Sequence, residues 1–236
     1  MSLNLINQVI TIVRIELKKI YRARIIPMVI MSFTLLLLIK RGPDWQQYTS
    51  NGLMFLVALI GLVGFGTLSS WVFANEFTSQ TFKDLLALPI SRKTIVGGKL
   101  LAIEIAELII TACELLIMIL FGLIYLHSPI PHHTLDSVIK ITLTTFSYNV
   151  LLSFLWPLVS SMTKSSLIPT ALSFGTLIIA VMFSGQQIGQ YIPWSIPGYF
   201  MAHTQHPGVI SNAIVTIVGI IGIYGTIYLW TKKDQQ

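Results

Sequence analysis

Residues Leu53–Ala74 read LMFLVALIGLVGFGTLSSWVFA, a run that carries no charged side chain. A helix needs about 20 mostly apolar residues to cross a bilayer, so this run predicts a membrane span. Other segments of similar character predict further spans, namely Ile25–Ile39, Leu100–Leu126, Val138–Met162, Leu167–Phe183 and Val209–Trp230. We therefore predict an all-α integral membrane protein with six transmembrane helices in a single domain, residues 1–236.

The overall composition supports a membrane protein and excludes two other classes. Hydrophobic residues make up 54% of the chain and charged residues only 10%, whereas about 25% of residues are charged in an ordinary soluble domain. A soluble globule could not hide this apolar surface, and a disordered chain would be more polar. The net charge of +6 does not indicate nucleic-acid binding, because basic residues in a membrane chain first report orientation.

The distribution of lysine and arginine predicts the orientation. With an even number of spans, both termini lie on one side, and that side carries 12 of the 15 basic residues. Positive charge favours the cytoplasmic side, so both termini are expected to be cytoplasmic. The 12 are Arg14, Lys18, Lys19, Arg22, Arg24, Lys83, Arg92, Lys93, Lys99, Lys164, Lys232 and Lys233, and the other three are Lys40, Arg41 and Lys140.

Residues 1–24 precede the first predicted span and have helical periodicity. Apolar side chains recur at intervals of three and four, which places them on one helix face; they are Leu3, Ile6, Ile10, Val13, Leu17 and Ile20. The pattern is typical of an amphipathic helix that lies in the membrane interface. The alternative is an ordinary surface helix packed on the rest of the protein.

Residues 75–99, NEFTSQTFKDLLALPISRKTIVGGK, form the longest predicted cytoplasmic connection. Its apolar residues predict a short helix that ends before Pro89, because a proline disfavours helical geometry in the residue before it. Ser91 is placed to cap the helix that follows. An apolar cytoplasmic helix either docks into a groove of a partner or packs on the chain's own spans.

This connection also carries a family resemblance, in the pattern Glu76-x4-Thr81-x3-Leu85-Leu86-x2-Pro89-Ile90-Ser91-Arg92-x6-Lys99 between the second and third spans. The pattern resembles the membrane subunits, or permeases, of type-two ABC exporters. The resemblance implies that residues 75–99 contain the coupling helix, which docks on a separate ATP-binding subunit. It also implies that residues 1–24 are the interfacial connector helix. The implied coupling residues are Glu76, Thr81, Phe82, Leu85, Leu86, Pro89, Ile90, Ser91, Arg92 and Lys99.

The same resemblance implies the partners and the location. The permease pairs with a second copy or a paralogue in a bacterial cytoplasmic membrane, and ATP and Mg²⁺ are bound by the ATPase subunits. The chain has no GxxxxGK[ST] loop to hold a phosphate, so no cofactor is expected on it. At this length the chain carries no large extracellular domain, and its last outer loop contains Tyr191-Ile192-Pro193-Trp194-Ser195-Ile196-Pro197. Together these features look similar to the small permeases of bacitracin export and lantibiotic self-immunity. This similarity implies a hydrophobic or amphipathic peptide, or a lipid-targeting antibiotic, as substrate.

The third predicted span carries acidic residues. Glu104, Glu107, Thr111 and Glu114 fall on one side of a helix and form a stripe about 15 Å long at ~1.5 Å per residue. An acidic group at mid-membrane costs about 2.5–3.5 kcal/mol on insertion scales, so the stripe should face the bundle interior or a partner. It serves either a substrate pathway or proton-linked gate, or only helix–helix hydrogen bonding.

Residues 184–207 are rich in proline and glycine and predict an outer segment that re-enters the membrane. Irregular backbone at membrane depth must be buried in protein or wet. The histidines lie in or beside outer loops, without the spacing of a closed metal site, so no metal is expected. They are His127, His132, His133, His203 and His206, and the sequence assigns no role to the last four.

The sequence also bears on three alternative functions. An intramembrane hydrolase would use Glu104 and Glu107 with a histidine, but the histidines lie outside the spans, so no catalytic residues are predicted. A permease for a lipid or another hydrophobic substrate stays open. A sensory membrane module is disfavoured because the long connection at 75–99 is typical of a chain driven by an energised partner.

Overall fold

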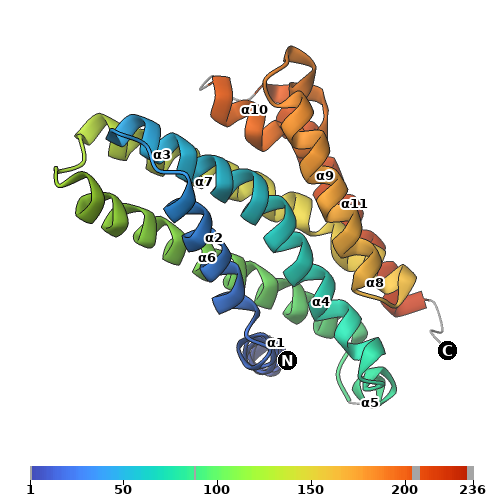
Figure 1. Ribbon diagram of the computed structural model, residues 1–236. Helices are drawn as coiled ribbons and strands as arrows, with labels where there is room; N and C mark the ends of the chain where they lie inside the picture. Colours follow the sequence, from blue (N-terminus) through green and yellow to red (C-terminus); the bar gives the residue numbers. More distant parts are fainter. Residues whose placement is uncertain (1, 88, 204–207, 233–236) are drawn as a thin grey trace.

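The computed structural model describes residues 2–87, 89–203 and 208–232, and every regular element in this part of the chain is a helix (Figure 1). The prediction of an all-helical protein is confirmed. In chain order the elements are α1 (Ser2–Arg22), α2 (Ile25–Ile39), α3 (Trp45–Met54), η1 (Phe55–Gly64), α4 (Phe65–Thr78), α5 (Phe82–Leu86), α6 (Arg92–Leu126), α7 (His132–Ser153), α8 (Leu155–Thr163), α9 (Leu167–Phe183), η2 (Gln187–Tyr191), η3 (Pro193–Ser195), α10 (Ile196–His203) and α11 (Val209–Lys232).

Four helices in the described part of the chain are long and apolar enough to cross a membrane. They are Trp45–Thr78, Arg92–Leu126, His132–Thr163 and Val209–Lys232. Helices α1 and α2 meet at a bend of 52° and add a fifth span if the pair counts as one. Helix α9 is apolar but has only 17 residues. The structure therefore supports four or five spans.

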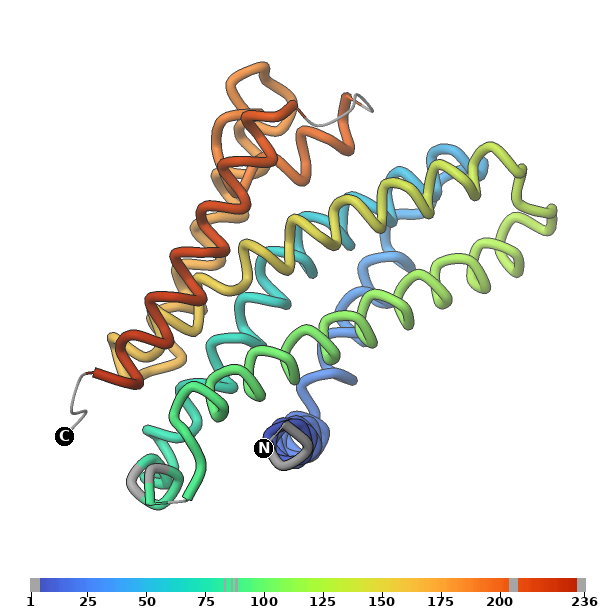
Figure 2. The backbone as a smooth tube through the Cα atoms, turned by 180° about the vertical axis from the view of Figure 1, so that it is seen from behind, coloured from blue at the N-terminus to red at the C-terminus, as the bar shows by residue number. Residues whose placement is uncertain are grey.

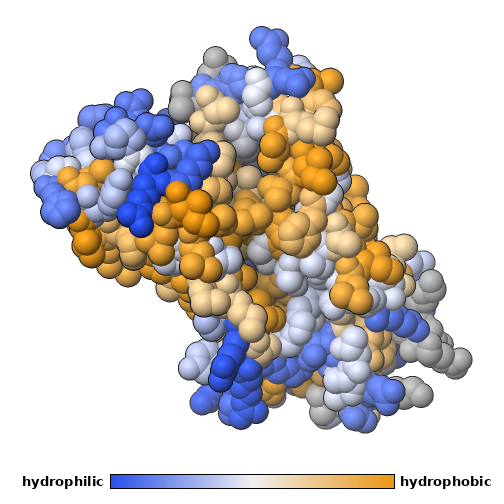
Figure 3. Space-filling view, viewed as in Figure 1, coloured by the Kyte–Doolittle hydropathy of each residue, from blue (hydrophilic) through white to orange (hydrophobic). Residues whose placement is uncertain are grey.

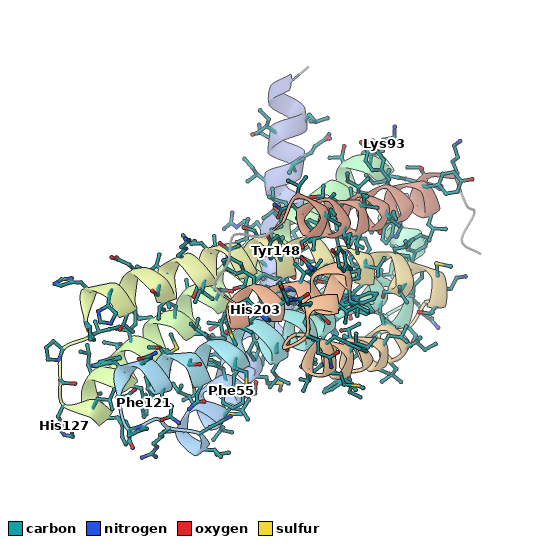
Figure 4. All side chains as sticks on the ribbon, turned by 90° about the horizontal axis from the view of Figure 1, so that it is seen from above. Phe55, Lys93, Phe121, His127, Tyr148 and His203 are labelled. Carbon is teal, nitrogen blue, oxygen red and sulfur yellow. The ribbon has the colours of Figure 1, made fainter. Side chains whose placement is uncertain are left out.

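Helix α1 packs on the protein with only part of its apolar face. Ile20 is fully buried and Val13 nearly so, whereas Ile6 and Ile10 are more than half exposed. The start of α1 extends beyond the bundle, as the view from above shows (Figure 4). Arg24 at the bend has a positive φ of 57°. The buried part fits the surface-helix interpretation, while the exposed part presents the apolar face expected of an interfacial helix.

The second apolar helix contains a π-helical segment, η1, between α3 and α4. The Asn149 side chain on α7 donates a hydrogen bond of 3.1 Å to the Val57 carbonyl within η1. Gly61 makes room for this amide, because a Cβ there would overlap the Asn149 side chain. Since π-helical turns are rare and occur often at functional sites, η1 is a distinctive feature of this span.

The helix formed by α7 and α8 is interrupted at Phe154. Helix α11 crosses this point at Gly222, where an added Cβ would lie 2.7 Å from the Leu155 backbone nitrogen. Glycine therefore lets the two backbones approach closely. The contact joins α11 to α8, and these two helices run side by side in both views (Figures 1 and 2).

The molecule has two distinct ends. Helices α1 and α5 and the end of α11 gather at the bottom of Figure 1, which we call the α5 end, and α10 lies at the opposite α10 end. Polar side chains concentrate at the ends, and an apolar surface lies between them (Figure 3). This distribution is the one expected of a bundle that spans a membrane.

Candidate functional site

Helix α5 lies in the connection that the sequence singles out. Helix α4 ends at Thr78, α5 ends at Leu86, and α6 begins at Arg92. The Ser91 hydroxyl accepts a hydrogen bond of 3.1 Å from the Thr94 backbone N–H. This bond confirms the predicted N-cap, which satisfies one of the free amides at the start of α6.

A buried ion cluster lies directly beneath this connection. Lys99 of α6 is fully buried, and its Nζ atom lies 2.8 Å from a Glu76 carboxylate oxygen and 3.1 Å from a Glu16 carboxylate oxygen. Lys19 contacts the same Glu76 oxygen at 2.7 Å and Glu16 at 2.9 Å. The Thr81 hydroxyl donates to the second Glu76 oxygen at 2.7 Å. The cluster therefore joins α1, α4, α6 and the start of the α5 segment.

Each buried charged group in this cluster is tolerated only because a group of opposite charge lies beside it. A buried ammonium or carboxylate group has lost its hydration, and only close partners of opposite charge make its burial tolerable. Two carboxylates and two ammonium groups alternate here, so the cluster is neutral. The Lys99 ammonium also donates to the Val72 carbonyl at 3.2 Å. Movement of any one helix would break several ion pairs together.

Aromatic contacts of Phe82 fix α5 to the neighbouring helices. Phe82 stacks on Phe77 with ring centroids 4.8 Å apart and meets the edge of Trp230 at 5.0 Å. The Trp230 indole N–H donates to the Ser161 hydroxyl at 2.9 Å. The Arg92 guanidinium donates to the Trp230 carbonyl at 3.2 Å. The end of α11 thus anchors both α5 and the start of α6.

The predicted coupling residues fall into three groups by exposure. Glu76, Phe82 and Lys99 are buried within the chain itself. Leu85, Ile90 and Arg92 are half-buried, and Thr81, Pro89 and Ser91 are exposed. The Leu86 side chain lies outside the described part of the structure. Buried members can only support the segment, so a partner would meet the exposed surface around Asp84, Ala87 and Pro89.

A cavity of about 380 Å³ opens beside the cluster. It lies between α1, the end of α4 and α5, and the Glu76, Lys19 and Leu85 side chains contribute to its wall. The α5 segment therefore does not close tightly over α1, and the cluster is reached from one side.

Two residues of the cluster, Glu16 and Lys19, were not among the predicted site residues. The amphipathic pattern placed Lys19 on the polar face of an interfacial helix, where a solvated charge is ordinary. A signal was available, because the chain has only nine acidic residues and Glu16 lies three positions before Lys19. A carboxylate and an ammonium at that spacing face each other on a helix.

The acidic stripe of α6 faces the bundle interior, as predicted. Glu107 and Glu114 are fully buried, and Thr111 between them is nearly so. The Ser69 hydroxyl of α4 lies 3.2 Å from one Glu107 oxygen. The other Glu107 oxygen and both Glu114 oxygens have no hydrogen-bond partner among the described residues. Glu104 is only half-buried.

The histidines do not assemble into a site. No three His, Cys, Asp or Glu side chains in the described ranges lie close enough to hold a metal ion. His203 stacks on Tyr199 with centroids 4.1 Å apart, and its Nδ1 lies 3.1 Å from the Tyr199 carbonyl oxygen. His132 and His133 begin α7, and His206 lies outside the described residues.

Comparison with known proteins identifies the family. Residues 12–182, which include the ion cluster, α5 and the acidic stripe, match the family described as ABC-2 family transporter protein. The bacitracin transport permease protein BCRB of Bacillus licheniformis is 26% identical over 197 residues, which cover 80% of this chain and 93% of that protein. The chain therefore belongs to the ABC-2 transporter family, as a membrane permease subunit without catalytic activity of its own.

Proposed function

We propose that this chain is the membrane subunit of an ATP-driven exporter, and that its ATPase partner docks at the α5 end. The observation that carries the proposal is the ion cluster in which the buried Glu16, Glu76 and Lys99 pair with one another and with the partly exposed Lys19. It connects the segment that would meet the ATPase to two membrane helices and to α1. ATP and Mg²⁺ would be bound by that separate subunit.

The proposed topology follows the charge distribution. Helices α1 and α5 and the end of α11 share one end of the molecule (Figure 1), and the loops and helix ends at this end carry most of the basic residues. We assign this end to the cytoplasm of a bacterial cell. Six spans result if α2 and the 17-residue α9 each cross the membrane, which short helices achieve by local thinning of the bilayer.

The proposed working unit is two permeases, identical or paralogous, with two ATPase subunits. Closure of the ATPases would press on α5, and the ion cluster would carry the movement into α4, α6 and α1. Export then rests on two conformations of the bundle that differ in affinity for the substrate.

The proposed substrate is an antimicrobial peptide or a lipid-targeting antibiotic, in resistance or self-immunity. The relative named as a bacitracin transport permease supports this class. A lipid or another hydrophobic molecule is the second candidate. Family membership sets aside the intramembrane hydrolase built on Glu104 and Glu107.

The docking surface can be tested without disturbing the core. We expect Ala87→Asp combined with Pro89→Asp to abolish copurification of the ATPase, because both positions are exposed and docking would bury two additional negative charges. The measurement is the amount of ATPase recovered with the tagged permease. Gly185→Asp with Gln186→Asp, at exposed positions near the α10 end, is the matched control. Undiminished ATPase recovery with the α5 variant would exclude docking at this surface.

The buried acidic residues offer a second test. Glutamine keeps the shape of glutamate and removes its charge, so a purely structural role would tolerate the change. If the charge or protonation of these carboxyl groups serves transport, we expect Glu114→Gln and Glu107→Gln to reduce transport by about tenfold, which corresponds to about 1.4 kcal/mol, with assembly intact. Glu104→Gln is the control, since Glu104 is half-buried on the same helix. Full transport by a Glu107→Gln/Glu114→Gln double variant would show that these acidic side chains have only a structural role.

A further inference from the structure

Two adjoining cavities lie at the α10 end, and they differ in chemistry. The first, of about 290 Å³, lies between α3 and α7. Its surface is largely apolar, with Leu53 and Val138 in the wall, but it also carries amide, hydroxyl and imidazole groups of Gln46, Thr49, Ser50, His133, Thr134 and Ser137. The second, of about 220 Å³, lies between η1, α9 and α10 and is lined mainly by apolar side chains, among them Val57, Ala58, Leu62, Ala180 and Val181.

Met201 on α10 lines both cavities, so the two adjoin at this side chain. Helix α10, which carries His203, crosses above η1 and α7 in the view from above (Figure 4). Met201 is half-buried, and a methionine side chain is flexible enough to change its rotamer as a ligand enters. The two cavities can therefore act as one site of two compartments.

The compartments open toward different surroundings. Gln46, Ser50 and His133 at the first cavity are exposed near the starts of α3 and α7, where the chain leaves the apolar band. Met54 at the end of α3 and Val181 of α9, both at the second cavity, are exposed on the apolar surface. The first opening therefore meets water or headgroups, and the second meets the lipid chains.

We propose that this pair of cavities binds a single-chain phospholipid, with its phosphate-bearing head in the first cavity and part of its acyl chain in the second. Hydroxyl, amide and imidazole donors suit phosphate and glycerol oxygens, and the described lining residues present no carboxylate that would repel a phosphate. The combined volume falls within the range of about 300–1,000 Å³ typical of ligand sites. The rest of the chain leaves between Met54 and Val181.

This inference deepens the proposed export function, on which the biological role of the site rests, and it favours a lipid-like substrate. Binding itself is a property of the permease alone. The site lies at the α10 end, so a molecule there would be received from, or released to, the leaflet opposite the ATPase.

The test uses purified permease and myristoyl lysophosphatidylglycerol that carries a diazirine in its chain. Photolabelling is expected to map to the η1 and α9 residues that line the second cavity. Ala58→Phe fills this cavity and should weaken labelling at least tenfold, and Ala202→Phe, at an exposed lining position, should do the same without a buried substitution. Ala171→Phe on the exposed face of α9 is the matched control. Glycerol 3-phosphate alone should not compete, because it lacks the chain.

Labelling that is unchanged in both cavity variants, or that spreads over the lipid-facing side of α11, would overturn the proposal. Competition by a cationic peptide but not by unlabelled lysophospholipid would also overturn it and assign the site to peptides. ATPase copurification, measured on the same samples, reports separately on the proposed function. Labelling in the cavities without ATPase binding would support the lipid site and contradict the proposed assembly of permease and ATPase.

Discussion

Lys99→Met is expected to destabilise the protein by about 3–5 kcal/mol, the effect of removing one partner from a buried ion pair. The ammonium group of Lys99 is fully buried between Glu16 and Glu76. Methionine fills the space of the aliphatic stem but leaves two buried carboxylates to share Lys19. The midpoint of thermal unfolding of the purified permease, followed by tryptophan fluorescence, should fall by several degrees.

The control is Lys93→Met, because Lys93 lies on the same helix with an exposed side chain that points away from the bundle (Figure 4). A second variant separates charge from packing. Glu76→Gln added to Lys99→Met removes the excess negative charge and should recover part of the lost stability. Further destabilisation by the second change would contradict the account of the cluster as a set of compensating charges.

Gly222→Leu is expected to prevent close packing of α11 on the junction of α7 and α8. A Cβ at position 222 would lie 2.7 Å from the Leu155 nitrogen and closer still to the Phe154 carbonyl oxygen. Both neighbours are backbone atoms, which cannot move aside as a side chain can. Overpacking commonly costs about 1–3 kcal/mol and more where the backbone must shift, so a large loss of folded, monodisperse protein is expected in size-exclusion chromatography.

Gly175→Leu provides the comparison for this change. Gly175 lies in α9, and nothing outside its own helix lies within 4 Å of an added Cβ. The same substitution there places a leucine in open space. If both variants elute and unfold alike, the close contact at Gly222 does not determine how α11 packs.

Much of the fold follows from the sequence because apolar length is a strong constraint in a membrane. The bounds predicted for the first and fifth spans, Ile25–Ile39 and Leu167–Phe183, match α2 and α9 at both ends. In each case a polar residue ends the apolar run. The burial of Glu107 and Glu114 was also predictable, since a carboxyl group on a spanning helix avoids lipid.

The parts that the sequence did not reveal depend on contacts between distant residues. Within η1, Val57 accepts a hydrogen bond from Asn149 of α7, and Gly61 leaves room for the Asn149 amide. Periodicity along one helix cannot report such a pairing. Glu16 and Lys19 can be recognised as members of the ion cluster only when α1 is placed beside Glu76 and Lys99. Phe82 had the character of a docking residue, yet the structure places it against Trp230, which lies far away in the sequence.

Helix α6 is the longest uninterrupted helix in the described part of the chain. Its 35 residues form a rod about 50 Å long at ~1.5 Å per residue, well beyond the ~30 Å hydrocarbon core of a bilayer. The helix from Trp45 to Thr78 contains η1, and the α7–α8 helix breaks at Phe154, so both can bend where α6 cannot. Lys99 lies near one end of the rod and Glu114 farther along it. A tilt of about 10° would displace one end of such a rod by roughly 9 Å relative to the other, so a small rotation of α6 at its Lys99 end would produce a large displacement at the opposite end.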